Sequence, residues 1–202
     1  YLTLAYSFVA NGLIRYLELP LGLGVDFLLF ASPLIALFSK EKPAFENLNS
    51  TLLYITLFWL AFTVLELFNP EAVSKIAWFY AVRAVSLYQL FCVFFLLLFL
   101  KHKKQVYLFT NLTLICCIIA AFWGFKQIFL GLDEWEIRWL ASGPVRTHVL
   151  FGVLRAFSFL SDSGQFGATM GYGAIVAFLL ALGPFSLKKK ILLLIVGLIS
   201  LY

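Results

Sequence analysis

The sequence predicts an all-α membrane protein, a polytopic bundle of about seven transmembrane helices. Hydrophobic residues make up 63% of the 202 residues, whereas charged residues make up 12%. The mean hydropathy is +0.98. A soluble fold of this length cannot bury so much apolar surface, so the solvent is expected to be largely lipid. The apolar residues form runs of about 18–20 without strict alternation, which favours helices over barrel strands.

Seven apolar runs follow one another along the chain, and turn-forming or charged residues separate them. The expected spans are 2–14, 21–38, 51–68, 85–100, 106–125, 166–185 and a last run from Ile191. The chain begins at Tyr1 and stops inside the last run, so we expect an N-terminal part of a longer protein. Residues 1–202 are expected to form a single transmembrane domain.

Lysines indicate the orientation of the spans. Two, three and three lysines lie in the short segments 39–50, 101–105 and 187–190. Cytoplasmic loops are enriched in such residues, which places the N-terminus in the cytoplasm. The external segments are then 15–22, 69–84 and 126–165. This topology also accounts for the net charge of +5, so a nucleic-acid partner is not expected.

The external segment 126–165 carries the most information about function. It is too charged to span a membrane and too aromatic to be a free linker. Its aromatic residues are typical of a segment that lies along the membrane interface, partly as a helix. They include Trp135, Trp139, Phe151, Phe157 and Phe159.

Four of the five arginines lie in the external segments 69–84 and 126–165: Arg83, Arg138, Arg146 and Arg155. The planar guanidinium suits phosphate or carboxylate, so these residues are candidates for holding a lipid-linked diphosphate. The alternative is that they pair with nearby acidic residues or with ordinary lipid phosphates. That alternative fits Arg138 best, because Glu134 lies one helical turn away.

Other polar residues of this region have two readings each. Asp162 lies in a Ser-Asp-Ser-Gly stretch, which is typical of a helix N-cap, or it is a polar group at the mouth of a site. His148 is either an interfacial side chain or, like Asp162, a candidate general base. Gly167 and Gly171 form a pair that favours close helix packing. The three cysteines have no metal-ligand spacing and are interpreted as packing residues.

One motif resembles a known family. Arg155 is followed by the pattern Ser-Phe-x-x-Asp-x-Gly-x-Phe-Gly, which begins at Ser158 and runs into the sixth expected span. Together with the order of the spans and the aromatic-flanked Arg83, this pattern is similar to the O-antigen ligase and polymerase family of bacterial envelope proteins. The motif covers about 20 residues, and the remaining likeness is in hydropathy.

The resemblance implies a multi-pass glycosyltransferase of the bacterial inner membrane. It would move a glycan from an undecaprenyl-diphosphate carrier, at the periplasmic face, to lipid A-core or to another lipid-linked glycan. No metal or other cofactor is implied. Arg155 and Arg83 would bind the diphosphate, with Arg146 as a third candidate and Ser158, Asp162 and His148 as polar support. The catalytic group is unassigned. A large periplasmic loop normally follows these spans, so the chain alone is expected to be inactive.

Two other functions remain open at this stage. A transporter or flippase for a lipid-linked or anionic solute would use the same arginines without bond chemistry, and it predicts broken helices at mid-membrane. The nearly unbroken runs favour the enzyme. A structural or sensory subunit would use the arginines only to anchor to lipid headgroups.

Overall fold

The computed structural model describes residues 1–17, 19, 21–38, 43–71 and 74–201. These residues form helices and one antiparallel two-stranded hairpin, which confirms the all-α fold class. The chain divides into two compact units. Unit 1 comprises Tyr1–Phe27 and Tyr107–Tyr202, and unit 2 comprises Leu28–Val106.

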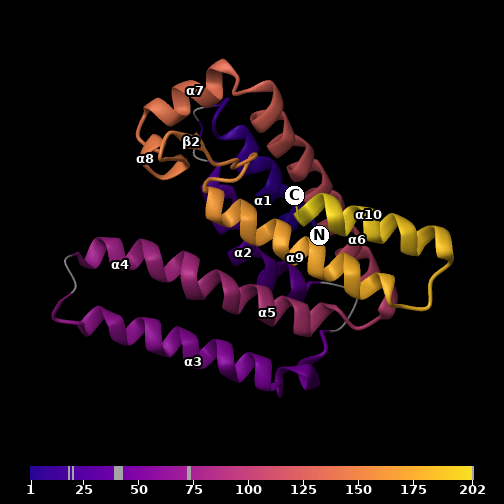
Figure 1. The fold of residues 1–202 in the computed structure, drawn as a ribbon. Helices are drawn as coiled ribbons and strands as arrows, with labels where there is room; N and C mark the ends of the chain where they lie inside the picture. Colours follow the sequence, from indigo (N-terminus) through magenta and orange to yellow (C-terminus); the bar gives the residue numbers. More distant parts are fainter. Residues whose placement is uncertain (18, 20, 39–42, 72–73, 202) are drawn as a thin grey trace. The chain divides into compact units, whose positions relative to one another are not determined.

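In unit 2, the helix Thr51–Phe68 runs beside the helix Lys75–Phe99 (Figure 1). The elements of this unit are the end of α2 (Gly22–Leu37), the 3-10 helix η1 (Phe45–Leu48), α3 (Thr51–Leu65), η2 (Glu66–Phe68), α4 (Lys75–Val82), the π-helix η3 (Arg83–Leu87) and α5 (Tyr88–Phe99). The indole N–H of Trp59 on α3 donates to the carbonyl of Val85 at 3.0 Å. Thr63 donates to the Ser86 hydroxyl at 2.8 Å. Such side-chain hydrogen bonds hold helices together in lipid.

Unit 1 packs a helical hairpin against a long helix. Its elements are α1 (Leu2–Leu13), the start of α2, α6 (Lys103–Phe125), the π-helix η4 (Lys126–Leu130), α7 (Glu134–Ala141), α8 (Val145–His148), β1 (Val149–Leu150), β2 (Val153–Leu154), α9 (Ser163–Ala181) and α10 (Leu187–Leu201). Figure 1 shows α9 and α10 side by side. Their core includes Leu114 of α6, Ala177 of α9 and Val196 of α10.

Among the described residues, four helices are long and apolar enough to cross a membrane: Thr51–Phe68, Lys75–Phe99, Lys103–Leu130 and Ser163–Ala181. Their outer surfaces are apolar, as at Phe58, Phe122 and Leu179. These features indicate a membrane protein. The prediction of about seven spans is not confirmed. Within the described residues α1 has 12 residues and α10 has 15, and neither is among these four helices.

Two helix boundaries differ from the prediction. The fourth expected span begins at Lys75 rather than at residue 85, because Ser74 caps the helix by accepting from the Ala77 amide at 3.2 Å. Arg83 therefore lies inside a continuous helix and not in an external loop. The fifth span extends to Leu130, through a π-helical turn. Consequently the connection between α6 and α9 contains residues 131–162, which we call the connecting segment.

Close packing of α9 uses a different glycine from the predicted pair. A Cβ atom added to Gly167 or Gly171 would meet nothing within 4 Å among the described atoms, whereas one added to Gly173 would lie 2.9 Å from Cys117 Sγ of α6. The prediction that the Gly167–Gly171 pair packs against a helix is therefore wrong. Buried Cys116 and Cys117 agree with the packing interpretation, while Cys92 is exposed.

Candidate functional site

The connecting segment is ordered by a capping box at the start of α7. The Asp133 carboxylate accepts from the Glu136 amide at 2.8 Å, and the Glu136 carboxylate accepts from the Asp133 amide at 2.9 Å. This reciprocal arrangement satisfies backbone donors that a helix start leaves free. The expectation that residues 126–165 are partly helical is thus confirmed.

Glu136 is the centre of a buried network. It has no exposed surface, yet its carboxylate accepts from three side chains. Lys126 donates to one oxygen at 2.7 Å, and Gln127 and Trp123 donate to the other at 2.7 and 2.9 Å. A buried carboxylate is stable only when it is paired and hydrogen-bonded in this way.

Gln127 connects this network to the irregular segment 155–161 that follows the hairpin. Its amide oxygen accepts from the backbone amides of Phe157 and Ser158, at 3.1 and 2.7 Å, and its amide nitrogen donates to the Ser158 carbonyl at 2.9 Å. Ser158 has a positive φ of 52°, and its hydroxyl donates to the Ala120 carbonyl of α6 at 2.7 Å. These bonds hold a left-handed backbone that a serine rarely adopts.

Arg15, near the N-terminus, also binds the backbone of the segment 155–161. Its guanidinium donates to the carbonyl of Ser158 at 2.6 Å and also to that of Leu160. The guanidinium carbon lies 4.3 Å from the Trp139 ring centre and 4.5 Å from that of Phe157. Guanidinium groups stack favourably on such rings. We call the buried residues Arg15, Gln127, Glu136 and Ser158, together with the partly exposed Asp133, the buried polar cluster.

Arg15 and Glu136 of this cluster are both ionised at neutral pH, although burial opposes the charge of each. Burial lowers the pKa of Arg15 to about 10, although Glu136, Tyr16 and Asp133 oppose that shift. Burial alone raises the pKa of Glu136, but hydrogen bonds from Lys126, Gln127 and others outweigh it and hold the pKa below the ordinary value. At neutral pH the cluster therefore contains a buried cation and a buried anion.

His148 is buried against aromatic rings and does not face solvent. It is 2% exposed, and its ring lies edge-on to Trp139 and Phe157 at 5.2 and 4.9 Å between centres. Its Nδ1 lies 2.8 Å from the Pro144 carbonyl, so this nitrogen carries a proton, while Nε2 has no partner among the described residues. In this position His148 has no access to a substrate hydroxyl.

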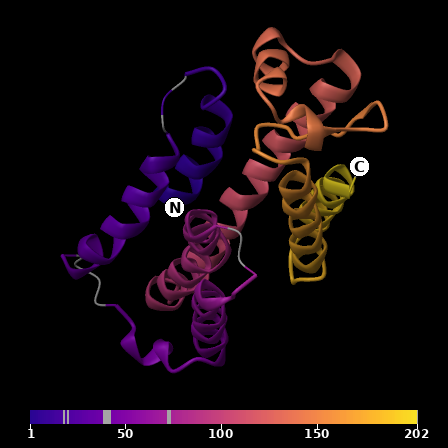
Figure 2. The ribbon, with the colours of Figure 1, turned by 90° about the vertical axis from the view of Figure 1, so that its left-hand side faces the viewer.

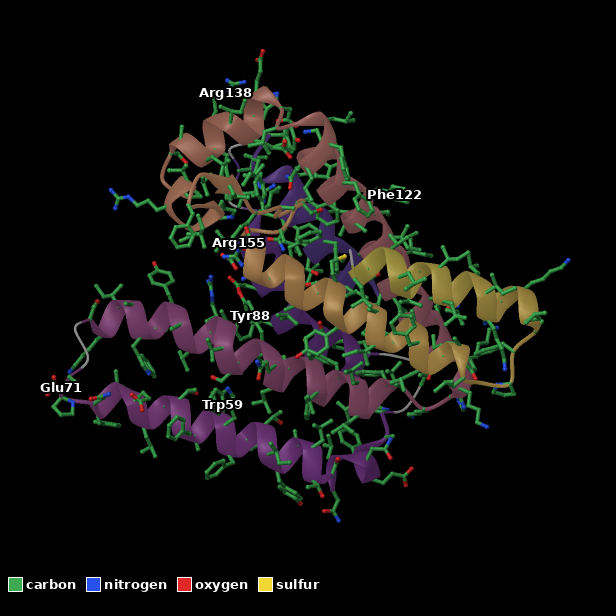
Figure 3. The ribbon with its side chains drawn as sticks, in the orientation of Figure 1. Trp59, Glu71, Tyr88, Phe122, Arg138 and Arg155 are labelled. Atoms are coloured by element: carbon green, nitrogen blue, oxygen red, sulfur yellow. The ribbon has the colours of Figure 1, made fainter. Side chains whose placement is uncertain are left out.

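The predicted substrate arginines of unit 1 are both exposed. Arg146 lies on α8 and Arg155 directly follows β2, and neither has an ion-pair partner among the residues that the structure describes. Figure 3 shows Arg155 near the start of α9 and Arg138 pointing outward from α7. Arg138 donates to the Glu134 carbonyl at 3.3 Å and lies over the Trp135 ring. Arg146 and Arg155 are therefore exposed cations without an ion-pair partner among the described residues.

The backbone around Arg155 is fixed on both sides. Its amide donates to the His148 carbonyl at 2.8 Å, which closes the hairpin. Its carbonyl accepts from the Ser163 hydroxyl at 3.1 Å, at the first residue of α9. The guanidinium thus extends from a defined point rather than from a free loop.

Arg83 belongs to unit 2, at the first residue of η3. Its guanidinium lies 5.9 Å from the ring centres of both Tyr80 and Tyr88. The structure brings Arg146 and Arg155 into one unit, and Arg83 into the other.

Two of the predicted supporting residues have structural roles. Asp162 is the N-cap of α9, where its carboxylate accepts from the amides of Gly164 and Gln165 at 2.7 and 3.1 Å. The N-cap reading of the sequence is confirmed. Ser158 is buried in the polar cluster. Asp162 therefore fixes the start of α9, and Ser158 fixes the segment between Arg155 and that helix.

Sequence reasoning missed Arg15, Gln127 and Glu136 as the groups that organise this region. Arg15 looked like the end of a short apolar run, and its partners lie more than 140 positions away. One signal was present in the sequence: Asp133 and Glu136 have the spacing of a capping box.

Comparisons with protein families, with curated proteins and with solved structures found no match. Within the described residues, His, Cys, Asp and Glu side chains form no group of three that could hold a metal ion. The fold and the site define a class: a helical membrane protein in which an ordered segment with exposed arginines joins two apolar helices.

Proposed function

We propose that the chain belongs to a glycosyltransferase of the O-antigen ligase or polymerase type, which takes a glycan from an undecaprenyl-diphosphate carrier at the periplasmic face of the bacterial inner membrane. One observation carries the proposal. Arg155 is an exposed guanidinium without an acidic partner among the described residues, on a backbone fixed at both ends. It stands at the start of the motif that resembles this family.

The chemistry of such a transfer suits a fixed guanidinium. The glycosyl bond to the diphosphate breaks as the acceptor hydroxyl attacks, and negative charge develops on the leaving diphosphate. A preorganised cation near those oxygens stabilises that charge more than it stabilises the ground state. Arg146 supplies a second exposed cation in the same segment. The acceptor proton needs a base, which we do not assign, since His148 is buried and Asp162 caps α9.

The carrier also has a long hydrocarbon chain. A groove of about 200 Å³ lies between α6, α9 and α10, and its lining includes Phe125, Gly167, Met170 and Gly171. No charged side chain lines it. Gly167 and Gly171 lie in the first half of α9, on the helix that follows Arg155. An apolar groove on this helix suits an isoprenoid chain.

The test is substitution of Arg155 by Lys and by Ala in the full-length protein, followed by an assay of glycan transfer from an undecaprenyl-diphosphate donor. We expect both variants to lose activity by about 10–100-fold, because lysine keeps the charge but not the two-pronged hydrogen bonds. Arg138→Ala is the matched control. It removes the same charge from an exposed site of the same segment, and activity should stay within about twofold.

Other outcomes separate the alternatives. Unchanged transfer in both Arg155 variants would remove this residue from the site. Donor binding that depends on Arg155, without any transfer by the wild-type protein, would instead favour a transporter or flippase. A cytoplasmic location of residue 155, measured with reporter fusions, would overturn the proposal itself.

A further inference from the structure

The hairpin of the connecting segment presents an apolar tip to its surroundings. Val149 pairs with Leu154 and Leu150 with Val153, in antiparallel register. Phe151, in the turn between the two strands, is fully exposed, at 104%, and Val153 of β2 is 66% exposed. In Figure 2 the orange part of the chain that contains this hairpin extends to the side, near the level at which α9 begins.

The turn at the tip is of the kind that usually takes Asn-Gly. Phe151 and Gly152 have φ values of 53° and 78°, and positive φ at both central positions is typical of a two-residue hairpin turn. A phenylalanine there adopts an unfavourable backbone conformation. Its ring packs on no described side chain that would offset this cost. The ring therefore contributes nothing to the packing of unit 1.

The charges around the tip match an anionic surface. Arg146 and Arg155 flank the hairpin and are both exposed. The stretch 137–161 contains three arginines and no Asp or Glu. Cations around an apolar tip are the pattern of segments that sit in the headgroup region of a bilayer, with the apolar residues in the upper acyl chains.

The hairpin lies in a part of the chain that can reach the headgroup region of a bilayer. It lies between Lys103–Leu130 and Ser163–Ala181, two helices that are long and apolar enough to cross a membrane. The connecting segment joins the end of the first to the start of the second, so it lies on one side of the bilayer.

We propose that the Val149–Leu154 hairpin dips into the outer part of the bilayer that α6 and α9 cross, with Phe151 among the acyl chains and the guanidinium groups of Arg146 and Arg155 at the level of the lipid phosphates. The partner is the phospholipid surface itself. The inference needs only that α6 and α9 are membrane spans, and it does not depend on the glycan transfer proposed above.

Photo-crosslinking tests this contact directly. The full-length protein carries p-benzoylphenylalanine at position 151, at position 153 or at position 138, and is reconstituted into vesicles of phosphatidylethanolamine and phosphatidylglycerol. Phe151 is replaced by a related aromatic group at a fully exposed site, so the fold is expected to persist. Arg138 is the control, because it points outward from α7 (Figure 3). After irradiation, mass spectrometry identifies the adducts.

We expect at least tenfold more phospholipid adduct at position 151 than at 138, with the attachment in the acyl chain, and an intermediate yield at 153. Equal and low lipid yields at 151 and 138 would overturn the proposal. An adduct to a second copy of the chain, in place of lipid, would also overturn it and would make the tip a protein interface. Since no transfer activity is measured, failure here leaves the proposed reaction untouched.

Discussion

The guanidinium of Arg15 donates a hydrogen bond to the carbonyl of Ser158, 143 positions further along the chain, at 2.6 Å. This hydrogen bond joins the end of α1 to the segment 155–161, which begins with Arg155. The same guanidinium stacks on Trp139 of α7 and on Phe157 of that segment, so one side chain contacts both. The order of the connecting segment therefore depends on a residue outside it.

Arg15→Lys is expected to loosen the connecting segment. The ammonium keeps the charge, but it cannot donate to both carbonyls while lying flat on two rings. An unsatisfied buried carbonyl costs about 1–3 kcal/mol. Hydrogen–deuterium exchange of residues 155–161 should rise by about 5–100-fold, since about 1.4 kcal/mol corresponds to a factor of ten. Arg138→Lys, at an exposed site, should leave exchange unchanged, and equal exchange in the two variants would contradict this role of Arg15.

Glu136 and Asp133 stabilise the connecting segment in their ionised forms, so we expect this segment to lose local stability in acid. The pKa values of Glu136 and Asp133 lie below their ordinary values of 4.5 and 3.8. Groups with a lowered folded-state pKa stabilise the fold above the ordinary pKa, and this stability is lost as the pH falls through the folded-state value. Protection of residues 131–141 should be constant from pH 7 to about 5 and should decline below pH 4.5.

Glu136→Gln separates this effect from general acid damage. Removing one partner of a buried ion pair costs about 3–5 kcal/mol, so the variant should already show weak protection at pH 7. Its protection should also vary less with pH than that of the wild type. Glu134→Gln, on the exposed face of α7, is the matched control and should behave as the wild type does. A Glu136→Gln variant with the wild-type pH profile would show that this carboxylate is not responsible.

Two glycines of α9 predict opposite effects of the same substitution. Gly173→Ala adds a Cβ 2.9 Å from Cys117 Sγ, and overpacking of this kind costs about 1–3 kcal/mol. Gly171→Ala adds a Cβ with nothing within 4 Å, and alanine should stabilise the helix by about 0.5–1 kcal/mol. Thermal unfolding of the purified protein in one detergent measures both. The Cys117→Ala background should relieve part of the Gly173→Ala effect, and a stabilised Gly173→Ala protein would refute the close approach of α6 and α9.

Local signals in the sequence predicted the secondary structure well. Asn69-Pro70 marks the end of the helix that η2 completes at Phe68, and Asp162 marks the start of α9. Such signals act within a few residues, which is why they are readable from the chain. Run lengths were less informative. Ser74 starts the helix of Lys75–Phe99 about ten residues ahead of the apolar run.

The site was predictable only in part, because its organising contacts are long-range. Arg146 and Arg155 are exposed, in agreement with their place in a charged segment between two apolar runs. The burial of His148 and the linkage of Arg15 to Ser158 require the tertiary fold. Arg15, which is buried, and Arg155, which is exposed, both have apolar neighbours in the sequence, so composition alone does not distinguish them.

The long separation between Arg15 and its carbonyl partners has a consequence for biogenesis. A ribosome that adds about 5–20 residues per second takes roughly 7–30 s to produce the 143 residues that separate Arg15 from Ser158. Until Ser158 and Leu160 have been made, Arg15 lacks both of its carbonyl partners, and its cation must be kept hydrated or held by headgroups. The contacts of Arg15 with the connecting segment therefore form only after residue 160 has been synthesised, whatever the order in which the earlier helices enter the membrane.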